Sequence, residues 1–371
     1  MGVDSSRLLQ LTDLSVDFRS QEGTVHAVDT VSFAVQPGEM VGLVGESGCG
    51  KSITALSILG LTRMMPTATV SGKIEFEGRD LLTLPEHEVR KVRGKDISMI
   101  FQDPVTSLNP VLSIERQMTE GLENHLGMSH GEAVKRSIEL LRMVGIPKAE
   151  QRINDYPHQF SGGMRQRVMI AIALSCNPRL LLADEPTTAL DVTIQAQILR
   201  LMKGLSKEYN AAIILITHDL GVVAGMTKRI LVMYAGRLVE VGPAKQLFKY
   251  PHHPYTVGLL RSVPRLDEPR KEHLQSIEGL PPDLAHLPPG CAFAPRCTLA
   301  TKDCWKEVPP LFPTAAGRFS ACFHYDQLLE SDARSAAAAG ESAAGAAYET
   351  PAGGVPAEGE SGGRIVDGGP A

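Results

Sequence analysis

The sequence predicts an α/β fold in which buried strands form a doubly wound sheet covered by helices, and three short stretches carry this prediction. Each is an apolar run of strand length that ends at glycine or polar residues: residues 40–44 (MVGLV), 179–186 (RLLLADEP) and 211–219 (AAIILITHD). Apolar runs of this kind are typical of strands buried on both faces. Because ligands bind beside the carboxyl ends of such strands, these three ends predict the functional site.

The first run continues directly into a glycine-rich loop, GESGCGKS (residues 45–52), and a helix-like stretch, residues 53–61. This order is the context that a phosphate-binding loop requires, although the loop alone also suits an ordinary turn. Glycines let backbone N–H groups curl around a phosphate chain, and the helix N-terminus adds a favourable dipole. We expect Lys51 to contact the β and γ phosphates and Ser52 to bind Mg²⁺. The loop residues predicted to contact nucleotide are Gly45, Glu46, Ser47, Gly48, Cys49, Gly50, Lys51 and Ser52.

The other two runs end in side chains suited to phosphate chemistry. Asp184 suits the outer coordination of Mg²⁺, and Glu185 suits polarising the attacking water, because hydrolysis of a phosphoanhydride depends mainly on positioning and charge stabilisation. His218 follows the third run and could contact the γ phosphate. The alternative interpretations are a solvated acidic loop and a structural histidine.

Length and composition restrict the class of protein. A chain of 371 residues, 43% hydrophobic, can bury one large core and a smaller appended unit. We expect a soluble cytosolic protein, because no apolar run approaches the roughly 20 residues that cross a bilayer. The net charge of -5 argues against nucleic-acid binding. Residues 329–371 are rich in Ala, Gly, Ser and Glu, which predicts a disordered acidic tail.

Residues 160–174 (FSGGMRQRVMIAIAL) resemble the signature of the ATP-binding cassette (ABC) family. Arg165 stands where the family usually has glutamine, and Phe160 where it has leucine. In this family two cassettes sandwich two ATP molecules head to tail. The resemblance therefore implies that Ser161, Gly162 and Gly163 contact the nucleotide bound to the other subunit, through N–H groups at a helix start.

Further family motifs occur in order, and the resemblance covers about residues 7 to 325. Gln102 matches the Q-loop, a sensor of the γ phosphate and Mg²⁺, Asp191 the D-loop, and His218 the switch histidine. Phe18 stands near the place of the aromatic that stacks on adenine, although a core aromatic is a close alternative. The resemblance implies ATP hydrolysis with Glu185, His218 and Gln102 as catalytic residues. It implies a Mg²⁺ site formed by Ser52, Gln102 and Asp184.

The same resemblance predicts the domain organisation. We expect an ATP-binding domain at residues 1–265, with a helical subdomain at about residues 103–175. Residues 131–146 repeat apolar side chains at three and four, as an amphipathic helix does. Residues 71–81 alternate apolar and polar side chains, which predicts part of an antiparallel β layer. A small cysteine-rich C-terminal domain is expected at residues 266–328.

Three stretches narrow the family: residues 101–114, 252–264 and 287–304 together resemble the ATPase subunits of oligopeptide and dipeptide importers. This implies a homologous second ATPase subunit, two integral membrane permeases, an extracellular solute-binding protein and a place on the cytoplasmic side of the membrane. Alternatives are an importer ATPase for nickel or another peptide-like solute, and a non-transport ABC ATPase. A DNA-repair or chromosome ATPase would need long heptad segments between the phosphate loop and the signature, and this interval is too short to hold them. A translation-factor ATPase would be expected to carry two cassettes, and this chain carries a single set of motifs.

Six cysteines occur, and Cys49 and Cys176 suit packing roles. The other four are spaced C-x5-C-x6-C-x17-C among Pro and Gly: Cys291, Cys297, Cys304 and Cys322. Disulfides are disfavoured in a reducing compartment, and the CxxC pairs typical of zinc sites do not occur. Spacing alone leaves a metal site and buried thiols equally open. The resemblance to the importers implies a 4Fe-4S cluster, with His324 as a substitute ligand or a surface residue.

Overall fold

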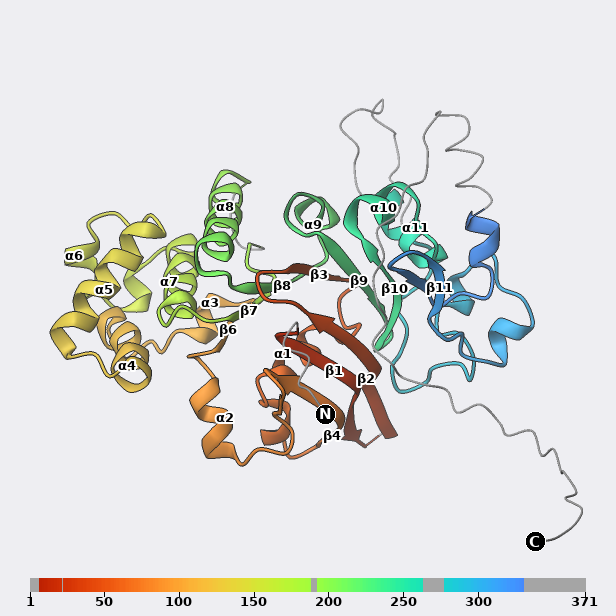
Figure 1. The fold of residues 1–371 in the computed structure, drawn as a ribbon, viewed down its shortest axis with the longest axis horizontal. Coiled ribbons are helices and arrows are strands. Elements are labelled where there is room, and N and C mark those ends of the chain that lie inside the picture. The colour runs from red at the N-terminus through yellow and green to blue at the C-terminus, as the bar shows by residue number, and fades with distance from the viewer. Residues whose placement is uncertain (1–6, 22, 188–191, 263–276, 330–371) are drawn as a thin grey trace, which may run out of the picture.

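The computed structural model describes residues 7–21, 23–187, 192–262 and 277–329. The predicted acidic tail lies outside these ranges except for its first residue, and Asp191 also lies outside them. Figure 1 shows a central sheet with helices on one side of it and, on the other side, a second sheet together with the helices α1 (Lys51–Ile58) and α2 (Glu86–Val92). Within the described ranges, no helix has the length and apolar character needed to cross a bilayer.

The central sheet is mixed. Its strands are β3 (Met40–Val44), β6 (Ile97–Ile100), β7 (Leu180–Asp184), β8 (Ala212–Thr217), β9 (Arg229–Tyr234), β10 (Arg237–Pro243), β11 (Phe312–Ala315) and β12 (Arg318–Ser320). They follow the order β11-β12-β10-β9-β3-β8-β7-β6. Neighbours from β9 to β6 pair in parallel, whereas β10, β12 and β11 are added antiparallel. The predicted α/β fold is confirmed, and all three predicted strands belong to the parallel part.

The second sheet is antiparallel throughout. It consists of β1 (Leu9–Ser20), β2 (Gly23–Val35), β4 (Ala68–Phe76) and β5 (Arg79–Asp80), in the order β2-β1-β4-β5. Residues 71–81, whose alternation predicted antiparallel strands, contain most of β4 and all of β5. The buried side chains of this sheet face the central sheet and form one side of the core.

Helices complete the layers. They are α1 (Lys51–Ile58), α2 (Glu86–Val92), α8 (Val192–Tyr209), α9 (Leu220–Met226), α10 (Ala244–Lys249) and α11 (Pro254–Arg261). Single 3₁₀ turns occur at η1 (Thr62–Met64), η2 (Pro157–Gln159), η3 (Ala294–Arg296) and η4 (Asp303–Trp305). In Figure 1, α8, α9 and α10 lie on the side of the central sheet opposite the antiparallel sheet.

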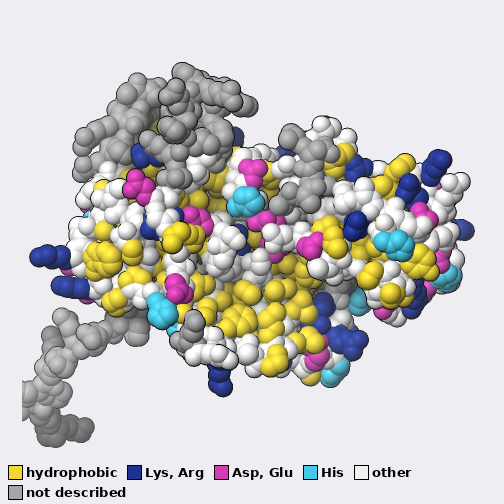
Figure 2. Space-filling view, turned by 180° about the vertical axis from the view of Figure 1, so that it is seen from behind, with side chains coloured by type: hydrophobic (Ala, Val, Ile, Leu, Met, Phe, Trp, Pro, Cys, Tyr) yellow, Lys and Arg dark blue, Asp and Glu magenta, His cyan; other side chains and the backbone are white. Residues whose placement is uncertain are grey.

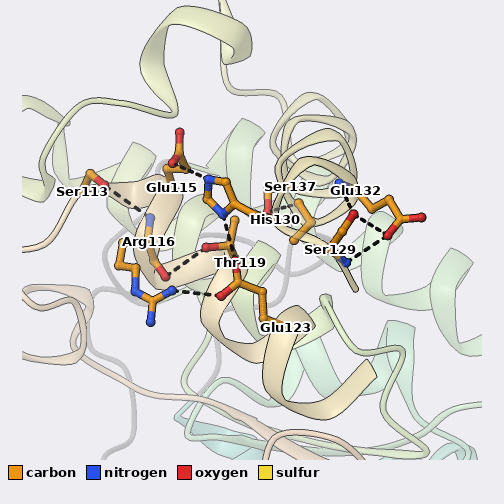
Figure 3. A network of polar contacts seen from close by, with 10 residues as sticks. Ser113, Glu115, Arg116, Thr119, Glu123, Ser129, His130, Glu132 and Ser137 are labelled. Atoms are coloured by element: carbon orange, nitrogen blue, oxygen red, sulfur yellow. Dashed lines mark hydrogen bonds and ion pairs between the residues drawn. The ribbon is translucent and has the colours of Figure 1, made fainter. Parts of the chain in front are cut away.

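Between β6 and β7 the chain forms a helical region at one end of the molecule (Figure 1). It contains α3 (Pro104–Ser107), α4 (Ile114–Leu126), α5 (His130–Met143), α6 (Ala149–Arg152) and α7 (Gly162–Leu174). Figure 3 shows polar contacts that join α4 to the start of α5, where the His130 ring lies 2.8 Å from the Glu123 carboxylate. This contact lowers the pKa of Glu123. Ser129 and Glu132 form a capping box that begins α5.

The core has two parts, one on each face of the central sheet. Side chains of successive strand residues point to opposite faces, so Met40 and Val44 of β3 join the helix-covered cluster, whereas Val41 and Leu43 join the cluster under the antiparallel sheet. This is why the sequences of the parallel strands β3, β7 and β8 are apolar except at their ends. Figure 2 shows the opposite face of the molecule from Figure 1, where Lys and Arg side chains occur in small groups among acidic ones.

The C-terminal segment returns to the central sheet and becomes part of it. β12 pairs with β10, and Arg318 of β12 lies 3.5 Å from Glu240 of β10 in an ion pair whose side chains are 6% and 1% exposed. Burial raises the pKa of Glu240 to about 7, even though a hydrogen bond from the His252 N–H and the charge of Arg318 both lower it. The Ser320 hydroxyl donates to the carbonyl of His252 at 2.7 Å. The segment that carries the four cysteines is therefore anchored to the central sheet through β12.

A glycine in β3 tests the packing of α9 on the central sheet. A Cβ at Gly42 would lie 2.4 Å from Cγ1 of Val223 in α9, so we expect Gly42→Ala to lower the free energy of unfolding by about 1–3 kcal/mol through overpacking. Gly204→Ala is the control, because a Cβ there meets nothing within 4 Å and helix propensity favours alanine by up to ~1 kcal/mol. Urea denaturation followed by circular dichroism measures both. Equal stability of Gly42→Ala and the unmodified chain would contradict the close packing.

Candidate functional site

The parallel strands β3, β6, β7 and β8 end at the same edge of the central sheet, and predicted site residues lie at or just after the end of each. Val44 of β3 is in register with Thr217 of β8, and β3 leads into the phosphate loop. Asp184 of β7 is in register with Ile216 of β8. The parallel alignment therefore brings together loops that are far apart in the sequence.

The backbone of the phosphate loop needs glycine at two positions where it approaches other strands. Gly45 has φ 157°, and a Cβ there would lie 2.2 Å from the carbonyl oxygen of Met233. Gly50 has φ 104°, and its Cβ would lie 2.3 Å from the carbonyl oxygen of Ala27. Any side chain at either position would push the loop away from β9 or β2. The loop geometry thus follows directly from the GESGCGKS sequence.

Lys51 is buried, and its ammonium group points into the loop. Nζ donates to the carbonyl oxygens of Gly45 at 2.8 Å and Glu46 at 2.7 Å. Cys49, also buried, lies with its Sγ 3.5 Å from Nζ, and burial raises the pKa of this thiol. The ammonium group is therefore held at the centre of the loop, where a phosphate group would accept its hydrogen bonds.

Asp184 and Ser52 are the side chains best placed to hold a divalent cation. Asp184 is 5% exposed, and burial raises the pKa of its carboxyl, while a hydrogen bond from Ser52 and the charge of Lys51 lower it. Hydroxyl and carboxylate oxygens are the ligands that Mg²⁺ prefers. These two residues come from α1 and β7 and meet only because their strands end at one edge.

Glu185 lies between two other predicted catalytic residues. Its Oε2 accepts a hydrogen bond from Nε2 of Gln102 at 2.9 Å, and its Oε1 lies 2.8 Å from Nδ1 of His218. The backbone of Glu185 is left-handed, with φ 45°, and its N–H donates to the carbonyl of Ile216 at 2.8 Å. The three polar side chains thus form one group at the sheet edge, with the carboxylate at its centre.

A cavity joins the phosphate loop to this group. Its lining residues are Ala27, Ser47, Gly48, Gly50, Lys51, Ser52, Ile53, Gln102 and Glu185. Ala27 of β2 was not predicted, because an alanine carries no chemical pattern that sequence reasoning could use. Loop, Q-loop glutamine and acidic residue therefore enclose one space that could receive a nucleotide phosphate chain.

Other predicted residues do not line this cavity. Ser161 begins α7 as its N-cap, and Gly162 beside it is exposed, with nothing within 4 Å of a Cβ. Phe18 of β1 is partly buried and packs against the core cluster beneath the antiparallel sheet, which matches the alternative interpretation of a core aromatic. Asp191 lies outside the described residues.

The four C-terminal cysteines line a second cavity, together with Phe293, Pro309, His324 and other residues. All are free thiols, and burial raises the pKa of Cys291, of Cys297 and, to about 12, of Cys322. Nε2 of His324 lies 3.5 Å from Sγ of Cys304. Over the described residues, however, no three His, Cys, Asp or Glu side chains are grouped closely enough to hold a metal ion. The predicted metal site is therefore not supported by this geometry.

Two residues from the C-terminal part of the chain, which sequence reasoning missed, contact the phosphate loop. The hydroxyl of Tyr255 accepts from the N–H of Glu46 at 2.7 Å, and the Arg296 guanidinium pairs with the Glu46 carboxylate at 2.6 and 3.0 Å. Both partners lie more than 200 residues from Glu46, at separations of 209 and 250. No local pattern in the sequence indicates such contacts.

Two family models match the chain. One, described as ABC transporter, matches residues 28–188, and another, described as oligopeptide/dipeptide transporter, C-terminal region, matches residues 239–304. The chain is 52% identical over 322 residues to the oligopeptide transport ATP-binding protein AppD of Bacillus subtilis, covering 87% of this chain and 98% of that protein. It is 52% identical over 316 residues to OppD of Salmonella typhimurium, covering 85% and 93%.

Solved structures agree with the sequence relatives. The chain resembles the ATP-binding cassette MJ0796, solved as a dimer in a post-hydrolysis state bound to ADP and Pi, with a TM-score of 0.56 and 30% identity over 64% of this chain and 98% of that one. It also resembles cbiO1 from Clostridium perfringens, part of a cbiONQ transporter complex, with a TM-score of 0.54 and 28% identity over 66% and 91%. The motifs, the cavity geometry and these similarities together show that the chain belongs to the ABC transporter ATPases, in the branch of the oligopeptide and dipeptide transport ATP-binding proteins.

Proposed function

We propose that this chain hydrolyses ATP as the ATP-binding subunit of an ABC importer for di- and oligopeptides. The observation that carries the proposal is the position of Glu185, which is held between Gln102 and His218 beside the phosphate loop. The similarity to OppD and AppD, which are named for oligopeptide transport, supports the choice of solute class.

In this proposal, each residue at the sheet edge has a separate role. Lys51 and the loop N–H groups bind the β and γ phosphates, and Ser52, Gln102 and Asp184 surround Mg²⁺. Glu185 polarises the attacking water, because its carboxylate already accepts from Gln102 and faces the His218 ring. His218 contacts the γ phosphate and keeps Glu185 oriented.

We further propose that the active unit contains two cassettes. Ser161, Gly162 and Gly163 are exposed or half-buried at the start of α7, where free N–H groups can receive the nucleotide of a second subunit. The related MJ0796 cassette, whose structure is described as dimeric, supports this arrangement. Asp191 would lie at the same interface, and Phe18 would stack on adenine.

The proposed assembly follows from the same family membership. The partner cassette is a homologous second ATPase, and two integral membrane permeases receive this subunit on the cytoplasmic side of the membrane. An extracellular solute-binding protein delivers the peptide. Within the chain, residues 1–265 with the helical subdomain at about 103–175 form the ATP-binding unit, and residues 266–328 form the C-terminal domain.

We also propose that the four C-terminal cysteines hold a 4Fe-4S cluster. Support for this proposal comes from the donor set alone, since four free thiols line one cavity that Phe293 and Pro309 also border, although in this structure the thiols are not grouped closely enough to form a metal site. Cysteine thiolates are the usual ligands of 4Fe-4S clusters. When bound, the cluster would cross-link and so stabilise a segment that contains few strands of its own.

Glu185→Gln tests the assignment of the general base. The amide keeps the shape of the side chain but loses the negative charge, so we expect ATP to bind while turnover falls roughly 10²–10⁴-fold. Steady-state phosphate release by the chain, purified with the subunits that co-purify with it, measures this. Glu139→Gln, on the exposed side of α5, is the control. Turnover near that of the unmodified chain would mean that another group activates the water.

Uptake by whole cells tests the solute class. Cells in which Glu185→Gln replaces the normal chain should lose uptake of radiolabelled di- and oligopeptides, because ATP hydrolysis no longer drives the complex. Uptake of radiolabelled nickel, measured in the same cells, should remain unchanged. Loss of nickel uptake with normal peptide uptake would reverse the assignment of the cargo.

Metal analysis tests the cluster. Chain purified without oxygen should be brown and contain about four irons and four sulfides, as a 4Fe-4S cluster requires. Cys322→Ser should lose most of the iron, whereas Cys176→Ser should keep it, because Cys176 is buried outside the second cavity. Zinc in place of iron, or equal iron in both variants, would refute the cluster.

A further inference from the structure

The cysteine-bearing segment contacts the phosphate loop through one ion pair. Arg296, in the turn η3 between Cys291 and Cys297, donates from Nη1 to Oε2 of Glu46 at 2.6 Å and from Nη2 to Oε1 at 3.0 Å. The two side chains are 6% and 23% exposed. Two parallel N–H···O bonds fix both the distance and the plane of the carboxylate, which a lysine could not do.

The guanidinium group has no donor left for a nucleotide. Nε donates to the carbonyl of Glu278 at 3.0 Å, Nη2 also approaches the carbonyl of Ile277 at 3.4 Å, and Nη1 lies 3.5 Å from the hydroxyl of Tyr234. Arg296 is also absent from the residues that line the nucleotide cavity. An effect of Arg296 on nucleotide would therefore be indirect, and Glu46 is the phosphate-loop residue that Arg296 contacts.

A second contact reaches the same loop residue. The N–H of Glu46 donates to the hydroxyl of Tyr255, which is fully buried. The Tyr255 ring packs against Tyr234 and Phe293, with centroids 4.6 and 5.5 Å away. Phe293 precedes Arg296 by one turn, so the aromatic group and the ion pair belong to one contact between the segment and the loop.

Glu46 in turn holds the lysine that meets the phosphates. Its carbonyl oxygen accepts from Nζ of Lys51 at 2.7 Å. All three polar groups of Glu46 therefore have partners. The side chain pairs with Arg296, the N–H donates to Tyr255, and the carbonyl accepts from Lys51. A shift of Glu46 would move the acceptor that positions the ammonium group.

We propose that Arg296 is a positioning residue of the nucleotide site. Through Glu46 it couples the conformational order of residues 291–304 to the affinity of the phosphate loop for MgATP. The proposal rests on the proposed function, since it assumes that this loop binds nucleotide. The coupling is reciprocal, so bound nucleotide also orders the cysteine-bearing segment.

The test measures MgATP affinity of the full chain by isothermal titration calorimetry. Arg296→Met keeps the length of the side chain but removes the ion pair, and Glu46→Gln removes it from the loop side, so the second variant serves if the first does not fold. We expect each to weaken binding roughly 5- to 10-fold, as couplings between sites usually do. The double variant should be no weaker than either single variant, because both remove the same interaction.

Two further variants separate positioning from general stability. Arg296→Lys keeps the charge without the fork and should fall between Arg296→Met and the unmodified chain. Lys302→Met is the matched control, because Lys302 is exposed in the same segment. Hydrogen exchange gives the reciprocal readout: MgATP should slow exchange at residues 291–304 in the unmodified chain and not in Arg296→Met.

Unchanged affinity in both Arg296→Met and Glu46→Gln, or single effects that multiply in the double variant, would overturn the proposal alone. Lys51→Ala distinguishes this from failure of the proposed function. If Lys51→Ala binds MgATP as tightly as the unmodified chain, the nucleotide assignment of the loop is wrong and the proposal falls with it.

Discussion

The parallel pairing of β6, β7, β8 and β3 is the constraint on which the rest of the structure depends. Hydrogen bonds between parallel strands set the register, and the register decides which residues lie opposite one another at the sheet edge. A slip of one residue in β7 would turn Asp184 to the other face and separate Glu185 from His218. The same slip would exchange the side chains of β7 between the two core clusters, because Leu181 and Ala183 lie in one cluster and Leu180 and Leu182 in the other.

Local patterns predicted the elements of the site well. The strand of residues 40–44, the loop after it and the acidic end of β7 were all found from short apolar runs and the residues that follow them. These features depend on neighbours in the sequence, since strand burial and glycine conformation are decided within a few residues. Sequence reasoning could place Glu185 at the sheet edge, but it could not give its hydrogen bonds. The contacts of Glu185 with Gln102 and His218 are seen only in the folded structure.

Contacts between distant segments could not be predicted. Glu46 and Arg296 are 250 residues apart, and each is an ordinary charged residue in a loop or turn. The four cysteines could be grouped from spacing, but their distances from one another depend on how η3, η4 and the segment after β12 pack. Phe18 suited two roles in the sequence, stacking on adenine or packing in the core. Its contact with the core became visible only in the fold.

Lys51 is never without acceptors, because the carbonyls of Gly45 and Glu46 already receive its hydrogen bonds. These two carbonyls take two of the three N–H donors of the ammonium group, so a bound phosphate would accept the third or replace one of the peptide oxygens. The affinity of the loop for a phosphate is therefore the difference between two sets of hydrogen bonds, those of the empty loop and those of the loaded one. The carbonyl oxygens of Gly45 and Glu46 thus contribute to the affinity of the loop even before a phosphate is bound.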